Sequence, residues 1–229
     1  MTRVRKVLWS IGLTALLLGG SFVVVPRLLW GDHGDYSHVV SIKQTAEYQD
    51  SALLRQAWAL PVARLYRNDI DFQRNASFCG PTSIVNVARS LNQSIDKAGV
   101  LDGTGIAPVM GFLLGGVTLD QLAGIVTQKL GRHVTVMRDL DRQGFREQLR
   151  HVNDVSRRYV VNFSRGPLFG SGGGHHSPIA GYLEDQDLVL VVDVNKAYGP
   201  WLVKSDRLYD AMNTLDATSH QKRGLLEID

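Results

Sequence analysis

Residues 73–91 read QRNASFCGPTSIVNVARSL and place the single cysteine of the chain directly before a helical pattern. Pro81 suits the first turn of a helix, where its missing N–H would have no partner. The apolar residues that follow recur at the spacing of one buried helical face, at Ile84, Val87, Ala88 and Leu91. We therefore predict a helix over residues 80–91 with Cys79 at its amino end.

The rest of the chain carries further helical and strand patterns. Helices are predicted over residues 51–60, 141–152 and 206–213. Another is opened by a capping box of Thr118 and Gln121 and ended by Gly131. Short strands are predicted over residues 133–137, 158–163, 177–183, 188–194 and 224–228. Since helices come first and antiparallel strands later, we predict one α+β domain rather than a parallel doubly wound fold.

Length and composition bound the class of protein. The chain has 229 residues, 44% of them hydrophobic, which suits one globular domain and excludes a disordered chain. A single cysteine excludes a disulfide scaffold and a four-thiolate metal site. The net charge of +3 comes from four cations in residues 1–30, because residues 31–229 hold 21 basic and 22 acidic residues. Nothing in this balance points to a nucleic-acid partner.

Residues 7–26 form an uncharged, apolar run near the amino terminus. Twenty helical residues span roughly 30 Å, the thickness of the hydrocarbon core of a bilayer. We predict a transmembrane helix within an anchor of residues 1–30, a tether of residues 31–45 and a domain of residues 46–229. Because cations precede the run, the domain is expected on the outer, periplasmic side of the membrane. A cleaved signal peptide and a buried core helix are the alternatives.

His175 and Asp193 give Cys79 the partners that nucleophilic catalysis needs. They lie 18 residues apart, at the outer ends of a predicted hairpin whose turn covers residues 184–187. Antiparallel pairing brings the two side chains together as a base and the carboxylate that orients it. The positive end of the helix favours the thiolate of Cys79. The alternatives are a buried structural cysteine, a loop histidine and a solvent-exposed carboxylate, and His176 is interpreted as an uninvolved neighbour.

Gln73 and the glycines before His175 complete the candidate site. Gln73 lies six residues before Cys79, where its amide could donate to the oxyanion of an acyl transfer, unless it is a surface glutamine. Gly174 ends a run of three glycines that lets a substrate backbone approach closely or forms a flexible loop. The histidines lack HExxH or regular i, i+4 spacing, so we predict no metal site.

Several segments resemble the phytochelatin synthase family. The resemblance is carried by residues 73–91, 116–122 (GVTLDQL), 173–179 (GGHHSPI), 193–201, 211–216 (AMNTLD) and 222–224 (KRG). It covers residues 45–229 in order and with similar spacings. It implies a papain-like cysteine enzyme that attacks the Cys–Gly amide of glutathione and releases glycine. The γ-glutamylcysteinyl thioester left on the enzyme would pass to water or to a second glutathione.

By position, the resemblance implies a catalytic and a substrate-binding group. Cys79 would be the nucleophile and His175 its base. Asp193 would orient the base, and Gln73 would donate to the oxyanion. The substrate-binding group would be Asp216, Arg223, Arg165 and Gly174. A carboxylate and a guanidinium suit the α-ammonium and α-carboxylate of a γ-glutamyl group.

The sequence departs from the family at His176, where the family usually has an apolar or aromatic residue. We also expect no cysteine-rich carboxy-terminal domain of the plant and yeast type, so the resemblance is to short bacterial members that look like glutathione hydrolases with weak transfer activity. No tightly bound cofactor is expected, and a divalent ion such as Cd or Zn would enter as the thiolate complex of glutathione. A homodimer is left open. A papain-like peptidase for a larger peptide and a non-catalytic, membrane-tethered binding domain are the alternatives.

Overall fold

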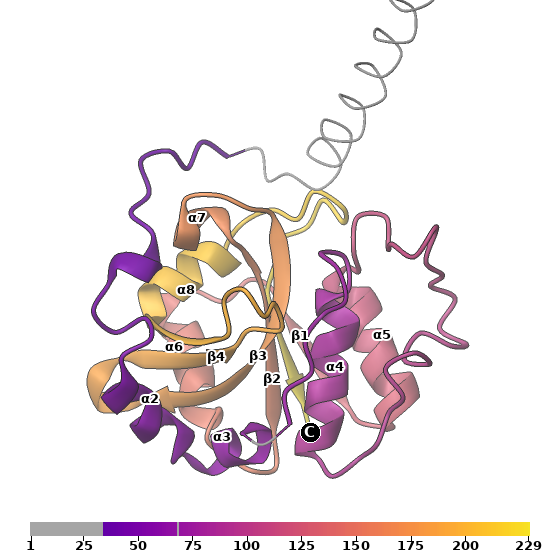
Figure 1. Cartoon of the computed structure of the whole chain (residues 1–229), viewed down its shortest axis with the longest axis horizontal. Helices are drawn as coiled ribbons and strands as arrows, with labels where there is room; N and C mark the ends of the chain where they lie inside the picture. Colours follow the sequence, from indigo (N-terminus) through magenta and orange to yellow (C-terminus); the bar gives the residue numbers. More distant parts are fainter. Residues whose placement is uncertain (1–33, 68) are drawn as a thin grey trace, which may run out of the picture.

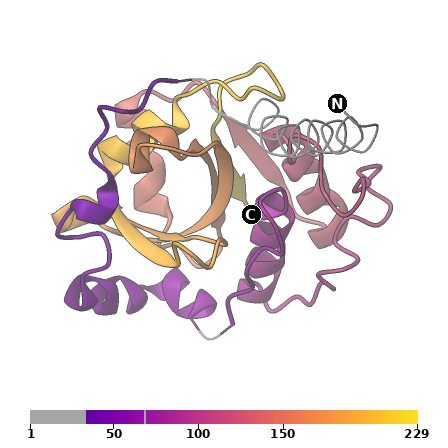
Figure 2. The same cartoon turned by 45° about the horizontal axis from the view of Figure 1, so that its top comes forward.

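A strongly curved antiparallel sheet forms the centre of the computed structural model, which describes residues 34–67 and 69–229 (Figures 1 and 2). Its strand order is β1-β6-β2-β3-β4-β5, so β2 and β3 lie in the middle. The strands are β1 (Val134–Met137), β2 (Arg158–Ser164), β3 (Gly174–Leu183), β4 (Leu188–Val192), β5 (Pro200–Lys204) and β6 (Leu225–Ile228).

Helices cover both faces of this sheet, because alternate side chains of its central strands are apolar on both sides. On one face, Tyr159 and Val161 of β2 pack with α6 (Arg142–His151), α7 (Gly166–Phe169) and α8 (Ser205–Met212). On the other face, Val160 packs with α4 (Cys79–Ser90) and α5 (Leu119–Leu130). The short helices α2 (Ser51–Trp58) and α3 (Pro61–Tyr66) cover the rest of that face over β3, β4 and β5. Figure 1 shows α4 and α5 side by side, away from α6 and α8.

The predicted helices are confirmed, and several of their ends follow the predicted capping residues. Thr118 and Gln121 form the capping box of α5, and Gly131 ends that helix in the left-handed conformation at φ 62°. Asp141 caps α6 through the backbone N–H of Gly144. At α2 the cap is Asp50 rather than Ser51, which is the first helical residue. Helices α3 and α7 and strand β5 were not evident from the sequence.

The predicted hairpin is confirmed, and it positions His175 and Asp193. Strands β3 and β4 pair antiparallel around the 3-10 turn η2 (Glu184–Gln186), with Leu183 opposite Leu188 and Ile179 opposite Val191. Strand β3 begins one residue before His175, and β4 ends one residue before Asp193. Both residues therefore lie at the same end of the hairpin.

The predicted fold class needs two corrections. Only α2, α3, α4 and α5 precede the strands, whereas α6, α7 and α8 alternate with strands along the chain. The second correction concerns the transmembrane helix. Its predicted residues 7–26 lie outside the described residues, and within residues 34–67 and 69–229 no helix is long and apolar enough to cross a bilayer. A membrane-spanning helix is therefore no part of the fold that the structure describes.

Part of the segment predicted as a tether packs on the domain. The 3-10 turn η1 (Ile42–Gln44) is capped by the side chain of Ser41, and Ile42 is buried in the core beside α7 and α8. The backbone of Tyr48 further accepts a hydrogen bond from the N–H of Leu202 on β5. The domain therefore holds the chain from residue 42 onward.

Candidate active site

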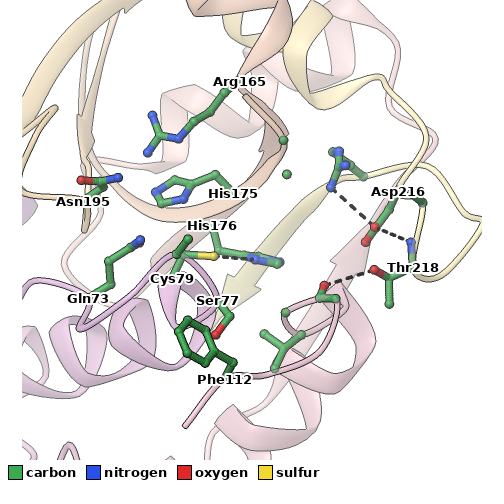
Figure 3. Close-up of a pocket in the computed structure, with 18 of the residues that line it drawn as sticks. Gln73, Ser77, Cys79, Phe112, Arg165, His175, His176, Asn195, Asp216 and Thr218 are labelled. Carbon is green, nitrogen blue, oxygen red and sulfur yellow. Dashed lines mark hydrogen bonds and ion pairs between the residues drawn. The ribbon is translucent and has the colours of Figure 1, made fainter. Parts of the chain in front are cut away.

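Cys79 is the first residue of α4 and lines a cavity of about 320 Å³ (Figure 3). The thiol is buried, with 5% of the residue exposed. The first turn of a helix leaves its N–H groups without intrahelical acceptors, so this end of α4 is positively polarised. The cavity is also lined by Gln73, His175, His176, Asp216 and Arg223.

Two adjacent histidines at the start of β3 flank the sulfur. Neighbouring residues of a strand point to opposite faces, and the pairing of β2 with β3 sets His175 opposite Phe163 and His176 opposite Asn162. The ring of His175 packs edge-on against Phe163, with the centroids 5.4 Å apart. The sulfur lies 3.9 Å from Nδ1 of His176. Figure 3 shows Cys79 between the two imidazoles.

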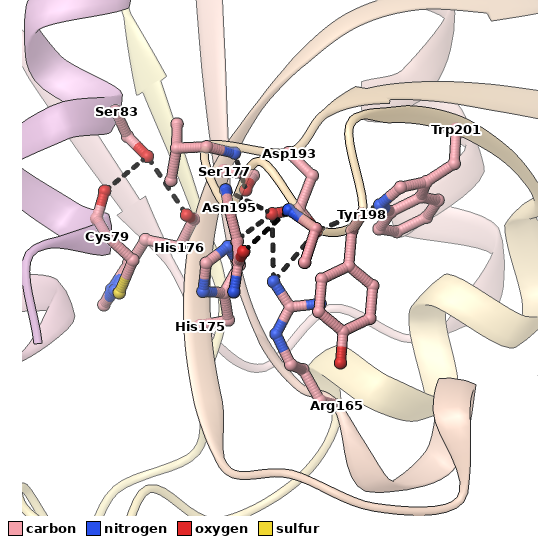
Figure 4. A network of polar contacts seen from close by, with 12 residues as sticks. Cys79, Ser83, Arg165, His175, His176, Ser177, Asp193, Asn195, Tyr198 and Trp201 are labelled. Carbon is pink, nitrogen blue, oxygen red and sulfur yellow. Dashed lines mark hydrogen bonds and ion pairs between the residues drawn. The ribbon is translucent and has the colours of Figure 1, made fainter. Parts of the chain in front are cut away.

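Asp193 is a fully buried carboxylate whose oxygens are both hydrogen-bonded (Figure 4). Oδ1 accepts from Nε2 of His175 at 2.9 Å and from the N–H of Asn195 at 2.8 Å. Nη2 of Arg165 lies 2.9 Å from each oxygen, and the indole N–H of Trp201 donates to Oδ2 at 3.0 Å. This set of donors stabilises the negative charge inside the protein.

The charges of these groups are coupled in the direction that nucleophilic catalysis requires. Burial raises the pKa of the Cys79 thiol, but the charge and hydrogen bond of His175, followed by those of His176, bring it well below its usual range. Burial and Arg165 lower the pKa of His175, yet Asp193 and Cys79 raise it overall. Burial opposes ionisation of Asp193, and its partners nevertheless hold its pKa far below the usual range. Both shifts favour a thiolate at Cys79 beside an imidazolium at His175.

The bond to Asp193 also decides which nitrogen of His175 carries out proton transfer. Nε2 faces the carboxylate, so Nδ1 is the nitrogen left for the sulfur and for a reacting group. The carboxylate fixes the tautomer and the ring orientation. The structure thus places Cys79 and His175 on one cavity and joins His175 to Asp193 by a hydrogen bond.

Gln73, the predicted oxyanion donor, lines the cavity together with Cys79. Its backbone N–H bonds the carbonyl of Val194 at 2.8 Å, which ties it to the chain just after Asp193. Its side chain lines the cavity, and in Figure 3 the amide nitrogen points toward His175 and Cys79. The amide and the N–H groups at the start of α4 form a set of donors beside the sulfur.

Asp216 and Arg223 lie together at the other end of the cavity. Both are buried, and Nη1 of Arg223 lies 3.7 Å from Oδ1 of Asp216 and 3.1 Å from Oδ1 of Asn162. A β-carbon at Gly174 would collide with the Arg223 guanidinium, so any other residue there would require the guanidinium to shift. The structure therefore brings three of the four predicted substrate-binding residues to one place.

Arg165 is placed apart from that group, against the catalytic carboxylate. Besides the contacts to Asp193, its guanidinium lies 3.8 Å from the centre of the Tyr198 ring. It also lines the cavity. Nη1 has no hydrogen-bond partner among the described residues. Its contact with substrate stays a prediction, whereas its ion pair with Asp193 is a structural fact.

The loop after α4 closes the rim of the cavity. Ser77 accepts a hydrogen bond from the N–H of Leu113 at 2.9 Å, and Asn75 donates to the carbonyl of Gly111 at 3.0 Å. On the far side, Thr218 donates to the carbonyl of Gly115 at 3.1 Å. The loop therefore joins the nucleophile segment to the segment that carries Asp216.

Two contacts escaped the sequence analysis. His176 contacts the sulfur of Cys79. The sequence signal for this contact was the alternation of side chains along a strand, which points neighbouring histidines to opposite faces. Trp201 binds Asp193 from β5, a strand that was not predicted. Among residues 34–67 and 69–229, no group of three or more His, Cys, Asp or Glu side chains is arranged to hold a metal ion.

Comparison with solved structures identifies the fold. A protein from Bacillus anthracis described as a C39-like peptidase superposes with a TM-score of 0.51 over 72% of this chain and 96% of its own. The two sequences are 12% identical. This likeness concerns the fold alone, which the chain shares with that C39-like protein.

Sequence comparison identifies the relatives. Glutathione gamma-glutamylcysteinyltransferase 3 of Lotus japonicus is 33% identical over 117 residues, which are 49% of this chain and 24% of that protein. The glutathione gamma-glutamylcysteinyltransferase of Schizosaccharomyces pombe is 26% identical over 117 residues, 50% of this chain and 28% of that protein. The chain thus matches about a quarter of the length of these relatives. The family model of phytochelatin synthase matches residues 110–225, just over half of the chain and the part that holds His175 and Asp193. The chain therefore belongs to the phytochelatin synthase family.

Proposed function

We propose that the protein is a cysteine acyltransferase and hydrolase that acts on glutathione. The thiolate of Cys79 attacks the carbonyl carbon of the Cys–Gly amide, and Gln73 with the N–H groups of α4 stabilises the oxyanion. The imidazolium of His175 gives its Nδ1 proton to the departing glycine amine. The γ-glutamylcysteinyl group remains on Cys79 as a thioester. The observation that carries this proposal is the arrangement of Cys79, His175 and Asp193 beside a cavity that is also lined by Asp216 and Arg223.

The far end of the cavity supports a γ-glutamyl substrate. A γ-glutamyl group ends in an α-ammonium and an α-carboxylate, which are opposite charges on one carbon. Asp216 and Arg223 present the complementary pair, 3.7 Å apart and buried. Burial strengthens such contacts, because less water screens them. A peptidase for larger peptides would have no need of this pair.

The thioester is resolved by an acceptor that gives its proton to Nδ1 of His175. Water as acceptor yields γ-glutamylcysteine, and a second glutathione yields a longer γ-glutamylcysteinyl chain. Divalent Zn or Cd enters this proposal as part of the substrate, bound to the thiolate of glutathione. No residue of the domain is assigned to hold it.

Release of glycine from glutathione by the full chain tests the proposal. The wild-type protein is expected to release glycine, and Cys79→Ala is expected to release none above the uncatalysed background, because no other described residue is a thiol. Asp216→Asn and Arg223→Gln should raise KM for glutathione without preventing alkylation of Cys79 by iodoacetamide.

Three results would contradict the proposal. Equal glycine release by Cys79→Ala and by wild type would exclude Cys79 as the nucleophile. Unchanged KM in both Asp216→Asn and Arg223→Gln would favour a peptidase with a different substrate. A Cys79 that alkylates no faster than a free thiol, with no inflection at low pH, would favour a binding domain without catalysis.

A further inference from the structure

His176 contacts the nucleophile but has no part in the triad. Only 4% of the residue is exposed, and its Nδ1 lies 3.9 Å from the sulfur of Cys79. Its carbonyl accepts a hydrogen bond at 3.1 Å from Ser83 of α4, which fixes the strand against the helix that carries Cys79 (Figure 4). A β-carbon at Gly80 would lie 3.7 Å from Nδ1, so the ring fits closely against the start of α4.

The surroundings of the ring determine where its proton lies. Nε2 is buried and has no hydrogen-bond partner among the described residues. An unpaired buried N–H is more costly than an unpaired acceptor, so the proton belongs on Nδ1. A thiolate beside Nδ1 favours the same tautomer, since it needs a donor. His176 is therefore placed to donate a hydrogen bond to the sulfur, whereas His175 exchanges a proton with reacting groups.

The two steps of the proposed reaction make opposite demands on this sulfur. In acylation Sγ begins as a thiolate and becomes a neutral thioester sulfur. In deacylation the acceptor oxygen bonds to the thioester carbon and its proton moves to Nδ1 of His175. The C–Sγ bond then breaks and its electron pair stays on Sγ. At that moment His175 is engaged with the acceptor, so the departing sulfur needs another donor.

We propose that His176 is a further catalytic residue, which donates Nδ1–H to Sγ of Cys79 and speeds the breakdown of the thioester. This rests on the proposed function, because it concerns the second step of that reaction. Acylation gains nothing from the same bond, since His176 stabilises the thiolate that acylation consumes.

Three variants of His176 separate this role from packing. His176→Phe keeps an aromatic ring and removes the donor. His176→Asn carries an amide N–H near the position of Nδ1, and His176→Gln carries one near the position of Nε2. His151→Phe, at the exposed end of α6, makes the same chemical change away from the cavity.

The experiment follows glycine and γ-glutamylcysteine separately after the full chain is mixed with glutathione. In His176→Phe and His176→Gln we expect a retained first turnover of glycine. Release of γ-glutamylcysteine should then be about tenfold slower than in wild type, the effect of one hydrogen bond to a charged group. Mass spectrometry should show the acyl group accumulating on Cys79. His176→Asn should recover most of the rate, and His151→Phe should behave as wild type.

The outcomes distinguish this inference from the function on which it rests. If wild type releases no glycine, the proposed function and this inference both fail. If wild type turns over and His176→Phe and His176→Gln slow both products equally, or slow neither, the inference alone is overturned. The inference would also be overturned if His176→Asn recovered no more of the rate than His176→Gln. Thermal unfolding of each variant shows which of them are folded, and the rates of the Asn and Gln variants decide between the outcomes if the Phe variant is unfolded.

Discussion

At the scale of single residues, the site depends on how completely Asp193 is bonded. A buried carboxylate without partners would take up a proton, which would remove its influence on His175. Here His175, Arg165, Trp201 and the backbone of Asn195 all donate to it. These donors hold the pKa of Asp193 far below its usual range, and the carboxylate fixes the tautomer and orientation of the His175 imidazole.

Asp193→Asn should narrow the pH range of reactivity from both sides. The carboxylate raises the pKa of His175, so its loss lowers that pKa and moves the alkaline limit to lower pH. A less charged His175 stabilises the thiolate less, so the pKa of Cys79 rises and the acid limit moves to higher pH. We expect kcat/KM at neutral pH to fall about tenfold or more, because one unit of pKa is a factor of ten in population.

The measurement is the rate of Cys79 alkylation by iodoacetamide, together with glycine release, as a function of pH. Asp185→Asn, on the exposed turn between β3 and β4, is the matched control and should leave both limits in place. Identical limits in Asp193→Asn and wild type would show that the carboxylate does not govern the pair.

At the scale of elements, helix α5 shows how local sequence fixes an end of a helix. Its first turn is held by the Thr118–Gln121 box, and its last by Gly131 in a left-handed conformation. Val117, directly before this helix, lines the cavity and lies against the start of α4. The register of α5 therefore contributes to the shape of the site.

Two substitutions of glycine by alanine on α5 should change stability in opposite directions. Gly124 lies inside the helix, and a β-carbon there meets nothing within 4 Å. Gly124→Ala should raise the free energy of unfolding by roughly 0.5–1 kcal/mol. A β-carbon at Gly131 also meets nothing within 4 Å, but the φ of 62° disfavours alanine. Gly131→Ala should therefore lower the free energy of unfolding by about 1–2 kcal/mol. Urea unfolding compares the pair, and changes of the same sign would contradict the conformational explanation.

At the scale of the whole molecule, the active site lies where the α4 layer meets the sheet. Cys79 comes from the helix, whereas His175, His176 and Asp193 come from the β3–β4 hairpin. Ser83 joins the two parts, because its hydroxyl lies 2.8 Å from the carbonyl of Cys79 and 3.1 Å from that of His176 (Figure 4). The distance between nucleophile and base therefore depends on how the layers pack.

Ser83→Ala should loosen this junction without touching a reacting group. The substitution removes the hydroxyl of the fully buried Ser83, which donates a hydrogen bond to the carbonyl of His176. This loss should lower the free energy of unfolding by about 1–3 kcal/mol. Glycine release should also fall, since small displacements of a nucleophile from its base slow catalysis. Ser94→Ala, after α4 and away from this junction, should change neither. A Ser83→Ala protein with wild-type stability and activity would show that the layers are held elsewhere.

Local patterns in the sequence were enough to predict most elements and, through them, much of the site. The helical spacing after Cys79, the capping box at Thr118 and the hairpin around residues 184–187 all depend on neighbours in the chain. The hairpin alone implied that His175 and Asp193 leave it at the same end. Such patterns can be interpreted because periodicity records which side of an element is buried.

The meeting of distant groups became evident only from the packed chain. The contact of His176 with Cys79 joins residues 97 positions apart, and the bonds of Trp201 and Arg165 to Asp193 join separate elements. Helix α7 and strand β5 were likewise not evident from local patterns. Periodicity tells which side of a strand is buried but not which layer covers it. That choice follows from the order and curvature of the sheet, which are set by the packing of the whole chain.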